Sequence, residues 1–564
     1  MQNHQEKELE KEKEKELELK PIPNKETEKE KKKEKKQKNK SKEAEESVLY
    51  LILPPVLLFA TLLISSYVGN EYEEEFGLYP YFDVRDLSIN IRKELYFSED
   101  RKTTFLDEWG SAYGYNNTID DFASSEKEHL KGDVYLDYTG SAIYTKTLVD
   151  EITSDWKINF YSNVHSRSTS SVRTEEQIQT IRRLVLEWFN TSDEEYSVIF
   201  TSGATASLKL VGESFPWKKE SQFVYCRSNH NSVIGIREFA TQFGAGFTVV
   251  TEPDLVEKDP EIIAQYPSFC EKSQMQYLTE PPDDLYHLFA YPAESNFDGS
   301  KFNLSMIDRF HHDHLFCNDT GKWLVLLDAA AFVPTNRLDL SRYKPDFVAL
   351  SFYKMFGLPT GIGALLVHNS VAPLMQKLFF GGGTVMISSC ESHLCVLHPN
   401  PSTRFEDGTV NFLSIIALKY GINMLNSLGI QSISDHVWTL TRYLYTNLIS
   451  LSHSNGQPFV EIYGKHHLNN PLYQGSIIAF NLKNPDGTYV GYFTIQKDSA
   501  DAGFHLRTED IHQLVSEKRS CGDKRDFIHS KPFGVVRVSL GYLTTFEEVD
   551  YFLTFLKMKY LDWD

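Results

Sequence analysis

The stretch DFVALSFYKMFGLPTGIG, residues 346–363, decides the fold of this chain of 564 residues. It begins as an apolar strand, reaches Lys354, and continues into a loop rich in glycine and proline. A second apolar run, WLVLL at residues 323–327, ends on Asp328. Continuous apolar runs of this length are typical of strands buried on both faces of a parallel sheet. We therefore expect Lys354 and Asp328 to lie at the ends of buried strands.

Strand-like runs and amphipathic helical patterns alternate around these two strands. Further apolar runs occupy residues 196–200, 222–226 and 247–250, and a helical pattern covers residues 175–189. Such alternation predicts an α/β fold with a mostly parallel sheet. In open sheets of this kind, ligands bind at the carboxyl ends of the strands.

Length, charge and cysteine usage restrict the class of protein. The length predicts at least two domains. The formal charge of −20 argues against a nucleic-acid partner, because no basic domain offsets it. The cysteines show no CxxC spacing, so we expect free thiols, with neither a disulfide framework nor a metal site. The six cysteines are Cys226, Cys270, Cys317, Cys390, Cys395 and Cys521.

The N-terminal region has two parts of opposite character. Residues 1–47 contain 15 Lys and 14 Glu and almost nothing apolar, which predicts a disordered tail. Residues 48–68 carry no charge and would span about 30 Å as a helix, so we expect a single transmembrane helix. A buried helix or an interfacial hairpin is the alternative. Lysines before the span and glutamates after it favour a cytosolic N-terminus, although the orientation stays open.

The remaining chain divides into three regions. Residues 69–130 are polar, aromatic and irregular and predict a connecting arm. Residues 131–420 form the predicted large domain, and residues 421–564 a smaller α+β domain. In the smaller domain, a helical pattern at residues 433–451 precedes strand-like runs at 476–482 and 535–541.

A motif of small residues suits a phosphate. TSGATA, residues 201–206, follows one strand and opens a helical stretch. Small side chains let backbone N–H groups approach a phosphate at a helix N-terminus, where the helix dipole favours an anion. The Thr205 hydroxyl can add a hydrogen bond. An ordinary turn between strand and helix is the alternative interpretation.

Two polar residues between this motif and Asp328 suit an aromatic ligand. His230, in SNHNS at residues 228–232, follows the next strand and can stack on a ring. Asn296, in SNFDG at residues 295–299, can bond a phenolic oxygen. Alone, each would be an ordinary strand-end histidine or turn asparagine.

Taken together, these residues indicate pyridoxal 5'-phosphate (PLP) chemistry. A buried lysine such as Lys354 can lose its proton and form a Schiff base with an aldehyde. A buried carboxylate such as Asp328 is the partner that the pyridinium nitrogen of PLP requires. A snorkelling lysine and a strand-end aspartate would explain either residue alone, but not the whole set of motifs.

The order of the motifs resembles the class V branch of the aspartate-aminotransferase fold, and within it the cysteine desulfurases. It is most similar to the N-terminal domain of eukaryotic molybdenum cofactor sulfurases, over roughly residues 105–564. The resemblance implies a type I PLP fold with a large and a small domain. The residues that carry it are VYLDYTGSA (134–142), YSNVHS (161–166), VIFTSGAT (198–205), His230, Asn296, LDAAAF (327–332), SFYK (351–354), GGGT (381–384), RFEDGT (404–409), LRT (506–508) and GVVRVS (534–539).

The resemblance also implies roles for the residues around the cofactor ring. Lys354 would be the Schiff-base lysine and, once released, the general base. Asp328 would keep the pyridine nitrogen protonated. His230 would stack on the ring, and Asn296 would contact its phenolic oxygen.

Further implied residues hold the phosphate and complete a dimer. Ala204, Thr205 and Ser351 would bind the phosphate of the same subunit. Thr384 matches a position that reaches the phosphate of the neighbouring subunit, so the resemblance implies a homodimer.

The implied substrate is an amino acid, and the resemblance to the desulfurases favours L-cysteine. Arg537 matches the arginine that binds the substrate carboxylate, for which a bidentate guanidinium is suited. Asn163 and Arg507 are the other implied substrate-binding residues.

The sequence departs from the family pattern in two ways. In the cofactor sulfurases, the arginine-threonine pair is followed by a loop with the nucleophilic cysteine that receives sulfur. Here Arg507 and Thr508 run into Glu509 and Asp510, and the next cysteine is Cys521. The molybdenum-cofactor-binding domain that follows in the family is not expected in this chain.

Three functions remain open from the sequence. The first is a sulfurase or desulfurase that uses another thiol, such as Cys390 or Cys395. The second is a PLP-dependent lyase, racemase or aminotransferase acting on an amino acid. The third is a membrane-tethered PLP-binding protein without catalysis. An error in the gene model would also explain the missing loop.

Overall fold

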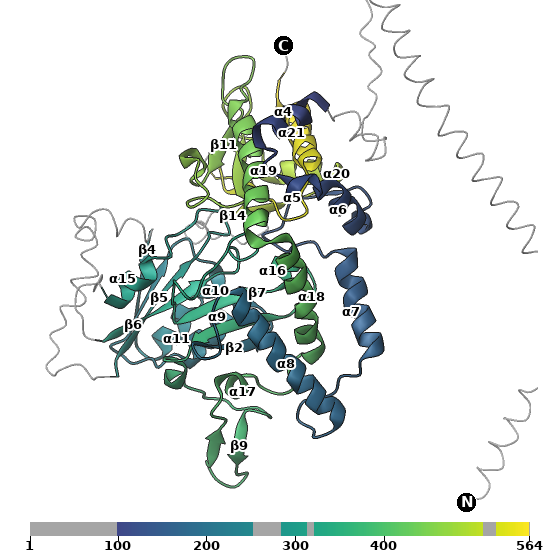
Figure 1. Ribbon diagram of the computed structural model, residues 1–564. Coiled ribbons are helices and arrows are strands. Elements are labelled where there is room, and N and C mark those ends of the chain that lie inside the picture. The colour runs from purple at the N-terminus through teal and green to yellow at the C-terminus, as the bar shows by residue number, and fades with distance from the viewer. Residues whose placement is uncertain (1–98, 252–283, 313–320, 511–525, 529, 563–564) are drawn as a thin grey trace, which may run out of the picture. The chain divides into compact units, whose positions relative to one another are not determined.

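The computed structural model describes residues 99–251, 284–312, 321–510, 526–528 and 530–562 (Figure 1). The predicted tail, the predicted span at residues 48–68 and the first part of the connecting arm lie outside these residues. Among the described helices, none alone is long and apolar enough to cross a membrane. One pair, Phe412–Leu428 with Ile430–Ser450, passes that test together but is bent by 69°.

A seven-stranded sheet forms the centre of the large domain. Its strand order is β2-β8-β7-β6-β5-β3-β4. Every neighbouring pair from β7 to β4 is parallel, and only β8 runs antiparallel to its two neighbours. The prediction of a mostly parallel α/β sheet is confirmed. The strands are β2 (Tyr196–Thr201), β3 (Gln222–Cys226), β4 (Gly246–Val250), β5 (Tyr286–Pro292), β6 (Lys322–Asp328), β7 (Phe347–Ser351) and β8 (Gly363–His368).

Burial explains why these segments form strands. All five residues of β7 are buried, as are the last five of β6. Strands covered on both faces need continuous apolar runs, which is the pattern that the sequence presents. The cover comes from helices on the two faces of the sheet (Figure 1). These helices are α7 (Lys146–Ile158), α8 (Thr169–Trp188), α9 (Ala204–Ser214), α10 (Asn231–Ile234), α11 (Ile236–Gln242), α15 (Met306–His312), α16 (Tyr353–Phe356), α17 (Pro401–Phe405) and α18 (Phe412–Leu428).

Helix α8 shows how local signals set these helices. The Ser168 side chain caps the helix by accepting a hydrogen bond from the Ser171 backbone N–H. Ile178, Ile181 and Val185 then recur at helical spacing and are buried. The helical pattern expected at residues 175–189 is therefore confirmed, although the helix begins earlier, at its cap.

A smaller four-stranded antiparallel sheet, in the order β11-β12-β17-β14, lies in the second half of the chain. The expected strand-like runs become β12 and β17, and the expected helix becomes α19. Residue 421, the predicted domain boundary, lies inside α18. The elements are α19 (Ile430–Ser450), β11 (Val460–Tyr463), β12 (Ile477–Leu482), α20 (Tyr492–Asp501), β14 (Arg507–Asp510), β17 (Gly534–Ser539) and α21 (Phe546–Tyr560).

The first described helices pack against the last ones. The ring of Phe105 in α4 packs against the ring of Phe546 in α21, with centroids 4.6 Å apart and the planes tilted by 32°. The Gly114 backbone N–H donates to Nδ1 of the buried His436 in α19. The prediction of an irregular arm is wrong for residues 99–126, because packing on α19 and α21 stabilises helices in this part. The helices are α4 (Glu99–Trp109), α5 (Gly114–Asn117) and α6 (Ile119–Glu126).

Short strand pairs complete the described chain. β1 (Val134–Tyr135) pairs in parallel with β13 (Phe504–His505), and β15 (Phe527–Ile528) pairs with β16 (Lys531–Pro532). β9 (Val385–Ser388) and β10 (Cys395–Leu397) form a hairpin that projects from the large domain (Figure 1).

Candidate functional site

The carboxyl ends of four strands meet around one cavity of about 470 Å³. β5, β6 and β7 end there on Pro292, Asp328 and Ser351, and β2 leads into α9 at the same edge. This is the edge at which open α/β sheets bind ligands. The residues that line the cavity are Ser202, Gly203, Ala204, Thr205, Ala206, Leu208, Lys209, His230, Pro292, Glu294, Asn296, Asp328, Ala330, Ala331, Ser351, Tyr353 and Lys354.

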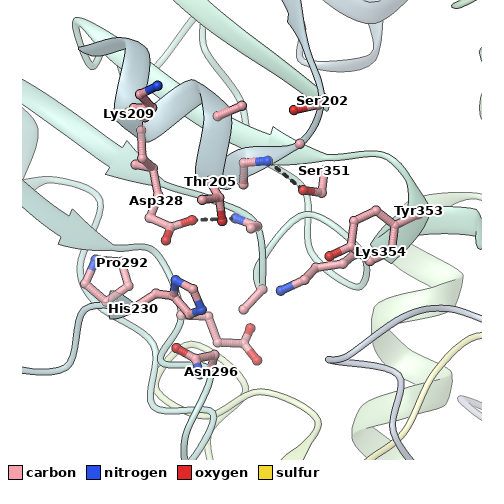
Figure 2. Close-up of a pocket in the computed structure, with 17 residues that line it drawn as sticks. Ser202, Thr205, Lys209, His230, Pro292, Asn296, Asp328, Ser351, Tyr353 and Lys354 are labelled. Atoms are coloured by element: carbon pink, nitrogen blue, oxygen red, sulfur yellow. Dashed lines mark hydrogen bonds between the residues drawn. The ribbon is translucent and has the colours of Figure 1, made fainter. Parts of the chain in front are cut away.

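Lys354 lies in the single helical turn α16, directly after β7, and points into the cavity (Figure 2). Burial lowers the pKa of its amine, the charge of Asp328 raises it, and the charges of Arg537 and Arg507 lower it further. The net result is a pKa below the ordinary 10.5. The environment therefore favours the neutral, nucleophilic form of the amine.

Asp328 is the last residue of β6 and is buried. Its Oδ1 accepts a hydrogen bond of 3.1 Å from the Ala330 backbone N–H, which fixes the carboxylate at the cavity wall (Figure 2). A carboxylate held in this way can accept a hydrogen bond from a protonated nitrogen of a ligand.

The N-terminus of α9 brings several hydrogen-bond donors to the cavity. Gly203 takes φ +141°, a conformation that favours glycine, just before the helix begins. The Ala204 backbone N–H donates to Ser351 Oγ at 2.8 Å, and the Thr205 and Ser232 hydroxyls lie 2.9 Å apart. Helix N–H groups and hydroxyl protons at one place are the donors that a phosphate requires. The motif at residues 201–206 therefore lies between the end of β2 and the start of α9, as the sequence predicted.

His230 and Asn296 line the wall across from Lys354 (Figure 2). His230 caps α10, since its Nδ1 accepts a hydrogen bond from the Ser232 backbone N–H at 3.1 Å. The Asn296 carbonyl accepts a hydrogen bond of 2.7 Å from Arg537 Nη1. The structure thus brings together seven predicted residues: Ala204, Thr205, His230, Asn296, Asp328, Ser351 and Lys354.

The cavity also contains polar residues that the sequence reading missed. Glu294 is only 2% exposed, and its Oε2 accepts a hydrogen bond from Asn336 Nδ2 at 3.1 Å. Burial raises the pKa of the Glu294 carboxyl, and burial lowers the pKa of nearby Lys301. The position of Glu294, two residues before Asn296, was the one feature of the sequence that could have identified it as a cavity residue. Ser202, Lys209 and Tyr353 were missed likewise.

Four predicted residues do not line this cavity. Thr384 is buried in the loop before β9 and donates to the Gly381 carbonyl at 2.8 Å. Asn163 donates from Nδ2 to Thr409 Oγ1 at 3.0 Å.

Arg507 and Arg537, the other two, face each other across β14 and β17. Asp137 lies between them, 3.0 Å from Arg507 Nη2 and 3.0 Å from Arg537 Nη2. Glu509 forms a second ion pair with Arg537, at 2.6 Å. We refer to Asp137, Arg507, Glu509 and Arg537 as the arginine cluster.

No cysteine is among the described residues that line the cavity. Cys226 is buried, and its Sγ lies 3.6 Å from the Thr251 carbonyl oxygen. Cys390 and Cys395 belong to the β9–β10 hairpin region and are exposed and half-buried. The other three cysteines lie outside the described residues.

The donor set of the cavity fits PLP. A helix N-terminus with hydroxyls suits its phosphate, a buried carboxylate suits its pyridinium nitrogen, and an amine of lowered pKa suits its aldehyde. These groups project into one cavity whose volume is in the range of small-molecule sites.

The sequence matches the family model described as Aminotransferase class-V over residues 134–552. Curated relatives include the molybdenum cofactor sulfurase of Solanum lycopersicum, 38% identical over 82% of this chain and 60% of the relative. The molybdenum cofactor sulfurase of Homo sapiens is 38% identical over 79% of this chain and 52% of the relative. The chain thus spans between half and two thirds of the length of these relatives.

Solved structures share the fold. The apo cysteine desulfurase of Thermococcus onnurineus NA1 has a TM-score of 0.57 and 21% identity, covering 76% of this chain and 96% of that chain. The cystine C-S lyase C-DES, in complex with cysteine persulfide, has a TM-score of 0.58 and 16% identity, covering 77% of this chain and 100% of that chain. The cavity therefore stands in a cysteine-desulfurase fold, and the family match covers both of its sheets: the chain belongs to the class-V aminotransferase family.

Proposed function

We propose that the protein is a PLP-dependent enzyme of the sulfurase and desulfurase type that acts on an amino acid, with L-cysteine as the substrate. The observation that carries this proposal is the position of Lys354. Its amine has a lowered pKa and shares one cavity with Asp328 and the N-terminus of α9.

Different residues of the cavity would bind different parts of the cofactor. Ala204, Thr205 and Ser351 would bind the phosphate, Asp328 the pyridine nitrogen and Asn296 the phenolic oxygen. His230 would lie against the ring. PLP, when bound, supplies an electron sink for the bond that breaks at the substrate α-carbon.

The protein supplies the proton transfer. The neutral Nζ of Lys354 would accept the proton from the α-carbon and return it later, which requires an amine of lowered pKa. Arg537, whose Nη1 bonds the carbonyl of the lining residue Asn296, would bind the substrate carboxylate, and Arg507 and Asn163 would assist from outside the cavity.

A second candidate reaction is favoured by the absence of a cysteine among the described lining residues. Removal of sulfur as a persulfide needs a thiolate beside the substrate. Without one, the same proton transfer at the α-carbon would lead to a lyase, racemase or aminotransferase reaction. Retention of the cofactor without catalysis is the third possibility.

We also propose a homodimer in which Thr384 reaches the partner's cofactor phosphate. The support is an exposed apolar surface around the β9–β10 hairpin, which we term the hairpin patch. Apolar side chains exposed together in this way mark interaction sites. The patch consists of Leu378, Phe379, Met386, Ile387 and Leu394, each more than half exposed.

Residues 48–68 are proposed to anchor the protein in a membrane as a single span. Their uncharged, apolar sequence of about 30 Å in helical form supports this proposal. We expect the full chain to stay in the membrane fraction after an alkaline wash, whereas release into the supernatant would contradict the anchor.

The test of the proposed function is spectroscopic. Protein lacking residues 1–68 is incubated with PLP, dialysed and examined for the visible absorbance of lysine-bound cofactor, before and after L-cysteine is added. Sulfide is assayed in the same sample. We expect a bound cofactor, a spectral change with L-cysteine and sulfide release.

The Lys354→Ala variant is expected to lose the covalent absorbance, while Lys497→Ala, on the exposed face of α20, retains it. A spectral change without sulfide supports the second candidate reaction. A protein that cannot be loaded with PLP contradicts the proposal. Loss of the absorbance in Lys209→Ala but not in Lys354→Ala would show that Lys209, and not Lys354, binds the cofactor covalently.

A further inference from the structure

The charges of the arginine cluster are balanced by the chain itself. Arg507 and Arg537 are direct partners in the antiparallel β14–β17 pair. Two like charges at such a position repel each other. The Asp137 carboxylate relieves this repulsion because its two oxygens bond the two guanidinium groups separately.

Glu509 neutralises the remaining positive charge. It lies two residues after Arg507 on β14, so its side chain points to the same face of the sheet. Its Oε1 lies 2.6 Å from Arg537 Nη1. Two arginines are thus matched by two carboxylates.

The cluster borders the candidate active site. Arg537 is 1% exposed, and its Nη1 also bonds the carbonyl of Asn296, which lines the cavity. The charges of Arg537 and Arg507 also act on the Lys354 amine. A substrate carboxylate that enters beside Lys354 therefore meets a guanidinium that already holds two carboxylates and a carbonyl.

We propose that Glu509 is a specificity-determining residue that competes with the carboxylate of the substrate for Arg537. An added carboxylate brings an uncompensated negative charge to a buried site. With Glu509 in place, the site binds α-amino acids less tightly than it would with a neutral residue at position 509, whereas primary amines that lack the carboxylate are unaffected. The inference rests on the proposed function, because it concerns the amino-acid site beside Lys354.

Replacing Glu509 by glutamine, a neutral residue of the same shape, tests whether Glu509 competes with the substrate carboxylate. In Glu509→Gln the cluster keeps its packing and gains one net positive charge. L-alanine and ethylamine, which differ only by the carboxylate, are titrated into PLP-loaded protein and followed by the cofactor spectrum. We expect the affinity for L-alanine relative to ethylamine to rise about tenfold or more in Glu509→Gln.

The matched control is Thr508→Val. Thr508 is the neighbouring residue of β14, and its hydroxyl lies 3.2 Å from Gln496 Oε1, away from the arginine cluster. Its substitution is expected to leave the ratio of the two affinities unchanged. An unchanged or lower ratio in Glu509→Gln overturns the inference, since a residue needed only for folding would not raise carboxylate affinity.

A second measurement works without the cofactor. Glu509→Ala leaves space beside Arg537 that an acetate ion can fill. We expect sodium acetate to raise the Tm of PLP-free Glu509→Ala by several degrees more than sodium chloride at equal ionic strength, with no such difference in the wild type. An equal response to the two salts overturns the competition. If PLP does not bind at all, the proposed function fails, whereas the acetate result still decides the role of Glu509.

Discussion

Arg182 and Glu406, 224 positions apart, form a buried bidentate ion pair with N–O distances of 2.7 and 2.6 Å. Arg182 also donates to the Val198 carbonyl, and Glu406 accepts from the Phe200 backbone N–H. Both side chains therefore hold β2, the strand that leads into α9 at the edge of the cavity.

Removing one partner of this pair is expected to destabilise the fold. Arg182→Met leaves the Glu406 carboxylate buried and unpaired, which costs about 3–5 kcal/mol. Urea unfolding measures the loss. The exposed pair of Lys146 and Glu128 is the control, since Lys146→Met should change stability by less than about 1 kcal/mol.

The double variant Arg182→Met/Glu406→Met separates pairing from packing. It is expected to recover part of the lost stability, because no buried charge remains uncompensated. A double variant as unstable as the sum of the two single variants would show that the ion pair itself contributes nothing.

The lowered pKa of Lys354 predicts a pH effect on the stability of the PLP-free protein. Below the folded-state pKa, the folded protein carries the cost of a buried charge. As pH rises from that pKa towards 10.5, the folded form loses the proton first, so this cost disappears. We therefore expect Lys354→Met to be more stable than the wild type at neutral pH, with the advantage shrinking at alkaline pH.

Thermal unfolding between pH 7 and pH 10 provides the measurement, and Lys497→Met on exposed α20 is the control. A Lys354→Met variant whose advantage is the same at both ends of this range would disprove the effect of burial on the amine.

His436 predicts an effect at acidic pH. Burial lowers its pKa to about 3. The imidazole binds a proton near pH 6.5 in the unfolded chain but only near pH 3 in the folded protein. The contribution of His436 to folding stability is therefore complete above pH 6.5 and is lost as pH falls towards 3. The total loss of folding free energy is on the order of 5 kcal/mol.

The variant His436→Gln should be less stable than the wild type at pH 7, with the difference narrowing by pH 4. Urea unfolding at several pH values tests this, with exposed His393→Gln as the matched substitution. A difference that stays constant with pH would mean that the imidazole is not the titrating group.

The hairpin patch predicts the effect of polar substitutions on self-association. Phe379 and Ile387 are 67% and 57% exposed, and Phe379→Ser/Ile387→Ser should shift the protein from dimer to monomer in sedimentation experiments. Ile449→Ser removes an apolar residue of similar exposure, 51%, from α19 outside the patch and should leave the assembly unchanged. A dimer that survives the double substitution would place the interface elsewhere.

Much of the site could be predicted from the sequence because its residues directly follow apolar runs that mark the ends of strands. Lys354, Asp328 and the small residues before α9 each follow an apolar run, and the parallel sheet brings such ends together. The antiparallel direction of β8 was not readable from periodicity. It follows from length, because residues 352–362 are too few for the crossover that a parallel neighbour of β7 needs.

The arginine cluster shows the limit of a linear reading. The resemblance gave Arg537 and Arg507 a substrate role, but the register that places Glu509 beside Arg537 depends on pairing between strands far apart in the chain. Helices α4 to α6 were missed for a related reason. Their short amphipathic patterns are weak, and their stability comes from partners near the C-terminus.

The packing of the first described helices on the last one also sets an order of events during protein synthesis. Arg101 and Asp550, joined by side-chain hydrogen bonds, are separated by 449 residues. A ribosome needs roughly 20 to 90 seconds to add that many residues. The contacts of α4 with α21 cannot form until α21 has been synthesised. A nascent chain that stops before α21 would expose Phe105 and Tyr113 and present an apolar surface to chaperones.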